Sequence, residues 1–114
     1  MATIAFSHAS EDIVSLSGRT LDLLIDHAVP GLADPAEAED LRMCSDVDGI
    51  SFHLFQPEAR ERVAVAVRAG ALEIRQELAS GIEPLPNFGA GNIAKLDEIL
   101  ALIDRFVPGG DGSR

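Results

Sequence analysis

The segment of residues 57–80 constrains the fold most, because its pattern fits only one kind of element. Pro57 stands where the first turn of a helix accepts proline, and Gly81 stands where helices commonly end. We therefore predict one long helix over residues 57–80, whose apolar side must pack against the rest of the chain. The residues of that apolar stripe are Val63, Val67, Ile74 and Leu78, with Gly70 and Ala71 between them.

Two short stretches, residues 3–7 and 49–54, alternate apolar residues with small or polar ones, as half-buried strands do. A ribbon of two strands is only marginally stable by itself, so helices are expected to cover its apolar face. In one alternative, residues 41–43 form a further strand, which makes a hairpin with the second stretch through the Asp-rich turn at residues 46–49.

The chain after the first strand has two possible structures. Ser10 can cap a helix that begins at Glu11, although Gly18 inside that helix would cost about 1 kcal/mol relative to alanine. The alternative is a strand over residues 13–17, followed by a shorter helix that Thr20 caps. The sequence leaves both possibilities open.

Two further helices are expected. Asp34 supplies an N-cap acceptor and Pro35 the first helical position of a short helix that runs to about Ser45. Asn92 caps a last helix over residues 92–107, which has a wide apolar face.

These elements predict a helix-dominated α+β fold, with about four helices and a small two- or three-stranded antiparallel ribbon. The length of 114 residues suits a single domain. We place that domain at residues 1–107 and expect the glycine-rich residues 108–114 to form a flexible tail.

Acidic residues are concentrated near the start of the chain. Residues 1–50 carry ten Asp and Glu against Arg19 and Arg42, so they supply −8 of the formal net charge of −10. An acidic surface repels nucleic acid and anionic membranes, and it speeds association with a basic protein. Six of the acids form the predicted partner-binding site: Asp34, Glu37, Glu39, Asp40, Asp46 and Asp48.

Cysteine content and the N-terminal sequence predict a cytoplasmic protein. Cys44 is the only cysteine, so a scaffold held by intrachain disulfides is excluded. The first residues lack the basic and apolar regions of a secretion signal, and no window approaches the ~18 apolar residues of a membrane span. With a single lysine in the chain, nucleic-acid binding is not expected.

No catalytic motif is complete. Cys44 lies near acidic residues, which raise a thiol pKa and suppress the reactive thiolate. An alternative function, as a small enzyme or ligand-binding domain, would have to combine His53 with Asp46 and Asp48 in one pocket.

Metal binding has no compact motif either. A site could take Asp22 and Asp26, one helical turn apart, and recruit a distant histidine. The acidic pairs Glu37 with Asp40 and Glu73 with Glu77 could in principle do acid and base work, but at helical spacing they are expected to form solvated faces. We therefore predict no metal, cofactor or catalytic residue.

Internal ion pairs offer another explanation for the acidic segment. If Arg60, Arg68 and Arg75 of the long helix face the acids of residues 34–40, part of the acid excess is neutralised within the fold.

The long helix also predicts self-association. Ala59, Ala66 and Gly70 make one side of it smooth enough for another helix to approach closely. We expect a homodimer through the helices 57–80 and 92–107, and a structural homo-oligomer subunit is a further candidate function.

Small size, charge asymmetry and the lack of a complete catalytic motif together favour one leading hypothesis. The chain is expected to be a small acidic cytoplasmic protein-binding module without catalytic activity, such as an inhibitor, an immunity-type protein or an adaptor, and its partner is expected to be a basic protein.

Overall fold

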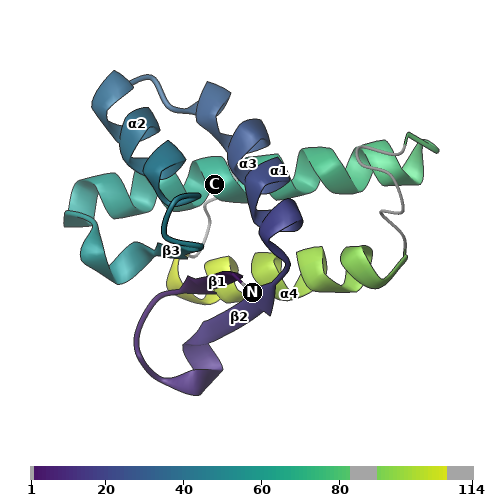
Figure 1. Cartoon of the computed structure of the whole chain (residues 1–114), viewed down its shortest axis with the longest axis horizontal. Helices are drawn as coiled ribbons and strands as arrows, with labels where there is room; N and C mark the ends of the chain where they lie inside the picture. The colour runs from purple at the N-terminus through teal and green to yellow at the C-terminus, as the bar shows by residue number, and fades with distance from the viewer. Residues whose placement is uncertain (1, 83–89, 108–114) are drawn as a thin grey trace.

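The structure is a computed structural model that describes residues 2–82 and 90–107 (Figure 1). Four α-helices and a three-stranded sheet make up this described part, which confirms the helix-dominated α+β class. Buried apolar side chains from the sheet and from all four helices form one core cluster. The predicted tail, residues 108–114, lies outside the described residues.

The N-terminal segment forms a β-hairpin. β1 (Ala2–Ala5) pairs antiparallel with β2 (Ile13–Leu16), and a short 3-10 helix, Ser10–Asp12, lies between them. The helix expected to start at Glu11 is therefore wrong, and the strand alternative is correct.

Helix α1 (Gly18–Ala28) begins directly after this hairpin. Its cap is Ser17 and not Thr20: the Ser17 hydroxyl accepts the backbone N–H of Thr20 at 3.1 Å. Gly18 thereby occupies the first helical position, where it avoids the cost of glycine inside a helix, and this explains why the longer helix does not form.

The third strand, β3 (Gly49–Ser51), pairs with β1 in parallel, so the sheet has the order β2-β1-β3 and is mixed. The prediction of a purely antiparallel ribbon is wrong. Parallel neighbours need a long crossover connection, and β2 with the helices α1 and α2 provides it. The strand predicted over residues 49–54 is also shorter than expected, because Phe52–Leu54 forms the 3-10 helix η3.

Helix α2 (Pro35–Met43) starts where the sequence predicts. The Asp34 carboxylate accepts the backbone N–H of Ala36 at 2.9 Å and caps the helix. The helix ends before the expected Ser45, and its helical residues 41–43 make the alternative hairpin arm wrong.

Helix α3 (Pro57–Ala79) confirms the long helix. Ser80 is its C-cap, and Gly81 adopts a left-handed φ of 84°, a conformation that suits glycine at a helix end. The predicted stripe faces the core, with Leu78 half-buried and its other members buried: Val63, Val67, Gly70, Ala71 and Ile74.

Helix α4 (Ala90–Phe106) runs alongside α3 (Figure 1). It begins before Asn92, so the prediction that Asn92 caps it is wrong. Its core-facing side chains are Leu96, Ile99, Leu102 and Ile103, and Val107 directly after the helix is buried as well. No helix in the described ranges is both long enough and apolar enough to cross a membrane.

Candidate functional site: an apolar groove with an acidic rim

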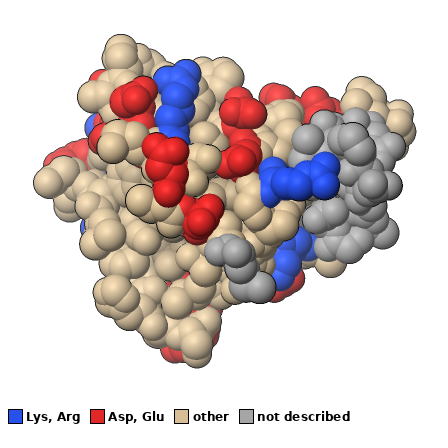
Figure 2. Space-filling view, in the orientation of Figure 1, with Lys and Arg blue, Asp and Glu red and all other residues tan. Residues whose placement is uncertain are grey.

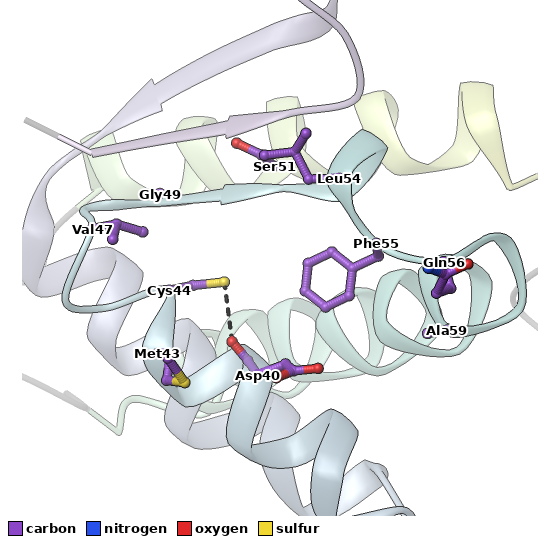
Figure 3. Close-up of a pocket in the computed structure, with 10 residues that line it drawn as sticks. All are labelled: Asp40, Met43, Cys44, Val47, Gly49, Ser51, Leu54, Phe55, Gln56 and Ala59. Carbon is purple, nitrogen blue, oxygen red and sulfur yellow. Dashed lines mark hydrogen bonds between the residues drawn. The ribbon is translucent and has the colours of Figure 1, made fainter.

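A groove of about 440 Å³ lies between the C-terminal end of α2, strand β3 and the first turn of α3 (Figure 3). The Cys44 side chain and the Phe55 ring point into the same space from opposite ends. Its lining residues are Asp40, Met43, Cys44, Val47, Gly49, Ser51, Leu54, Phe55, Gln56 and Ala59.

Large apolar side chains around this groove are unusually exposed. The exposed fractions are 55% for Met43, 76% for Val47 and 76% for Leu54. These three account for half of the six exposed large hydrophobic side chains in the described part of the chain, and all three line one groove. Single exposed apolar residues are ordinary, but a contiguous patch marks a surface that binds something.

The turn between α2 and β3 shapes one wall of the groove. Asp48 adopts a left-handed φ of 55°, and the backbone N–H of Gly49 then reaches the carbonyl of Cys44 at 3.1 Å. A side chain at Gly49 would approach the carbonyl oxygen of Thr3 to 3.0 Å, so glycine permits the close pairing with β1. This tight turn projects Val47 outward.

Arg60 holds the opposite wall. Its guanidinium donates to the backbone carbonyls of Phe52 at 2.9 Å, His53 at 3.2 Å and Phe55 at 3.1 Å. These hydrogen bonds tie η3 to α3 and fix the backbone that carries Leu54 and Phe55. The groove is therefore formed by a constrained backbone.

Cys44 contributes an apolar wall and no nucleophile. Burial raises the pKa of its thiol to about 11, and the nearby Asp40 adds to the rise. The thiol donates a hydrogen bond of 3.5 Å to the carbonyl oxygen of Asp40. At neutral pH it is protonated, which removes the thiolate that nucleophilic catalysis requires.

Acidic side chains lie beside the groove. Figure 2 shows a group of Asp and Glu side chains on the face that carries α2, with a basic side chain among them. Of the six predicted partner-binding acids, the five exposed ones are Asp34, Glu39, Asp40, Asp46 and Asp48. Asp40 lines the groove itself, while Asp46 and Asp48 flank Val47 in the turn.

Glu37 differs from the other five. It is 6% exposed, and its two carboxylate oxygens each accept from Nε of Arg62 at 3.0 Å, with a further ion pair to the Arg62 Nη2. Glu37 therefore fastens α2 to α3 and does not belong to the exposed acidic rim of the groove, which consists of Asp40, Asp46 and Asp48.

A larger hollow of about 800 Å³ lies over the pair of Glu37 and Arg62, between the segment after α1 and helix α3.

The three arginines considered for internal pairing have other partners. Arg60 binds backbone carbonyls, as described above, while Arg68 pairs with Asp104 at 2.7 Å and Arg75 with Asp97 at 2.8 Å. Near the rim, Arg42 lies 3.9 Å from Glu39, one turn away on the same helix. The arginine of α3 that pairs with the acidic segment is Arg62, which is not one of the three predicted arginines.

The alternative pocket around His53 does not assemble in the described residues. Both ring nitrogens of His53 are buried and have no hydrogen-bond partner there, so neither is hydrogen-bonded to Asp46 or Asp48. The His53 ring instead packs edge-on against His8, with 4.8 Å between the ring centroids.

Two of the three small residues on α3, Ala66 and Gly70, face the inside of this chain, while Ala59 lines the groove. A side chain at Gly70 would approach the backbone nitrogen of Ala28 to 3.0 Å, so α1 occupies the space that glycine leaves. Ala66 is buried, next to Gly31. The close helix approach that suggested a dimer is made between α1 and α3 of one chain.

Sequence reasoning missed the groove because its apolar members come from separate elements. Met43 ends α2, Val47 lies in the turn and Leu54 lies in η3. One signal was present: Met43 and Val47 are large apolar residues among the charged and small residues of the segment 42–48.

Comparison with known proteins finds no protein similar to this chain. No protein-family model matches the chain, and neither a curated protein nor a solved structure shows significant similarity to it.

Proposed function

We propose that this chain is a cytoplasmic protein-binding module without catalytic activity, which docks a basic segment of a partner protein on the apolar groove. The observation that carries the proposal is the convergence of Met43, Val47 and Leu54, all strongly exposed, on one groove. Keeping large apolar side chains in water is unfavourable, and a partner that covers them gains roughly 25 cal/mol for each Å² buried.

Charge complementarity supports a basic partner. Asp40 is the only charged residue among those that line the groove, and the exposed Asp46 and Asp48 flank Val47. A matching segment would place apolar anchor side chains in the groove and Lys or Arg beside the acids. Such rim charges mainly raise the association rate and select the partner, while the apolar anchors supply most of the affinity.

The chemistry around the groove supports binding without catalysis. The buried Cys44 thiol is protonated at neutral pH, and the groove lining includes no histidine. A binding role requires only shape, apolar surface and charge, which this site offers. An inhibitor, an immunity-type protein or an adaptor would use the surface in this way.

Site-specific photo-crosslinking in the native cells tests the proposal. A photoreactive amino acid at Val47 should capture a defined partner, and mass spectrometry should locate the cross-link in a segment with apolar residues beside Lys or Arg. The matched control is the same amino acid at Leu72, which is 40% exposed on α3 and does not line the groove.

The binding of the purified partner then provides the quantitative check. Leu54→Ser should weaken binding by about tenfold or more, whereas Leu72→Ser should leave it unchanged. Equal capture from Val47 and Leu72, or a cross-linked segment without basic residues, would count against the proposal.

A further inference from the structure

Three side chains able to bind a metal meet where α1 crosses α3, and none of them lines the groove. His27 lies on α1, while Glu73 and Glu77 lie one turn apart on α3. His27 Nε2 is 3.6 Å from Glu73 Oε1 and 3.3 Å from Glu77 Oε1. All three potential ligand atoms lie within 4.8 Å of one another.

The crossing itself fixes this arrangement. Gly70 lies one turn before Glu73, and a Cβ there would come within 3.2 Å of the carbonyl carbon of His27. The backbone that carries the histidine is therefore held against the helix that carries both glutamates. The cluster thus rests on two packed helices rather than on mobile loops.

The second ring nitrogen of His27 is held in the orientation that a metal ligand needs. Nδ1 lies 3.0 Å from the carbonyl oxygen of Leu23, which can only accept a hydrogen bond, so Nδ1 carries a proton. Nε2 lies at hydrogen-bond distance, 3.3 Å, from Glu77 Oε1, and a metal ion bound there would take the place of a proton on Nε2. Metal-bound histidines usually donate the other ring N–H to a carbonyl or carboxylate in this way.

The distances suit zinc. With metal–ligand bonds of about 2.0–2.1 Å, tetrahedral ligands lie about 3.3–3.4 Å apart, and the two histidine–glutamate distances are 3.3 and 3.6 Å. The two glutamate oxygens lie within 4.8 Å of each other, and a rotation of the exposed Glu73 side chain would bring them to the same spacing. The exposed side-chain fractions are 16% for His27, 30% for Glu77 and 61% for Glu73, so one side of the cluster is open to water.

The geometry points to a zinc site formed by His27, Glu73 and Glu77, with water as the fourth ligand. Zinc with three protein ligands and a water is an established coordination pattern. Bound there, the ion links α1 to α3 and stabilises the folded chain in proportion to its occupancy. The site does not use Asp22 and Asp26, whose spacing alone does not predict a metal site, and the Asp22 carboxylate accepts the Ser45 hydroxyl at 2.5 Å.

Zinc titration of the chelator-treated full chain tests this site. We expect one zinc ion per chain by calorimetry, a higher melting temperature with zinc, and a zinc-dependent change of the His27 Nε2 signal in nitrogen-15 NMR while Nδ1 keeps its proton. Glu77→Gln preserves the side-chain shape and should weaken zinc binding by at least about tenfold, as should His27→Gln.

Two matched variants distinguish this site from other histidines and acids. His8→Gln removes a histidine whose ring packs against His53, and Glu61→Gln removes an exposed acid of α3 outside the cluster. Both should retain the zinc affinity of the unaltered chain. The site is refuted if millimolar zinc leaves the His27 signals unchanged, or if zinc binding persists in Glu77→Gln and is lost in His8→Gln.

Discussion

Arg62 of α3 holds the buried carboxylate of Glu37 on α2, with its Nε 3.0 Å from both carboxylate oxygens. Glu37 is 6% exposed, whereas the Arg62 side chain is 57% exposed. The pair joins α2 to α3 and withdraws one predicted partner-binding acid from the surface. Of the remaining exposed acids, Asp40, Asp46 and Asp48 lie at the end of α2 that borders the groove, whereas Asp34 caps the opposite end.

Removing the two partners of this pair should have unequal effects. Arg62→Met leaves the Glu37 carboxylate buried without a counterion, whereas Glu37→Met leaves an arginine that water can solvate. Urea denaturation should show the larger loss of stability for Arg62→Met, with the double variant close to Glu37→Met alone. Equal and additive losses would contradict this account of the pair.

The close crossing of α1 and α3 should depend on glycine at position 70. A methyl group there meets the backbone nitrogen of Ala28 at 3.0 Å, so Gly70→Ala should lower the free energy of unfolding by about 1–3 kcal/mol despite the better helix propensity of alanine. Gly18→Ala is the control, because no atom lies within 4 Å of its added Cβ. It should be neutral or slightly stabilising, and a similar loss for both variants would contradict the packing argument.

The raised pKa of Cys44 should make stability depend on alkaline pH. The folded-state pKa is raised from 9.0 to about 11, so the folded chain holds the thiol proton more tightly than the unfolded chain does. The contribution is fully present below pH 9 and is lost as pH rises from about 9 to about 11.

Denaturation at several pH values, with Cys44→Ala as comparison, measures this effect. The stability of the unaltered chain should fall more steeply above pH 9 than that of the variant. Alkylation of Cys44 in the folded chain should be slow at neutral pH and become fast in denaturant. Rapid alkylation of the folded chain at pH 7 would show that the thiol is neither buried nor protonated as described.

The acidic rim should control how fast a basic partner associates. Asp48→Asn keeps the turn, because asparagine tolerates the left-handed φ of 55° found there, and it removes one rim charge. Stopped-flow measurements should show slower association and a weaker dependence on salt. Glu11→Gln removes an exposed charge on the N-terminal hairpin instead and should change neither quantity.

Residues that begin or end a helix through their own backbone and capping chemistry allowed α2 and α3 to be predicted from the sequence. Pro57 with Gly81, and Asp34 with Pro35, mark helix ends through their own backbone and capping chemistry, so α2 and α3 start where expected. The acids before Gly49 likewise predicted a turn. These features depend on residues that are neighbours in the chain.

Features that depend on distant contacts were beyond sequence reasoning. The parallel pairing of β1 with β3 follows from the crossover through α1 and α2, and the groove requires that pairing together with the Arg60 contacts. The spacing of Glu73 and Glu77 was visible, but only the α1–α3 crossing brings His27 to them. The spacing of residues along one helix does not reveal which other helix will pack against it.

Selection from a displayed peptide library tests most directly whether the groove with its acidic rim docks a basic partner segment. The unaltered chain is the target, and Met43→Ser/Val47→Ser/Leu54→Ser is the matched protein for counter-selection. We predict enriched peptides that combine large apolar residues with neighbouring Lys or Arg, and that lose binding to the triple variant while it stays folded. Peptides that bind both proteins equally, or enrichment of acidic sequences, would contradict the claim.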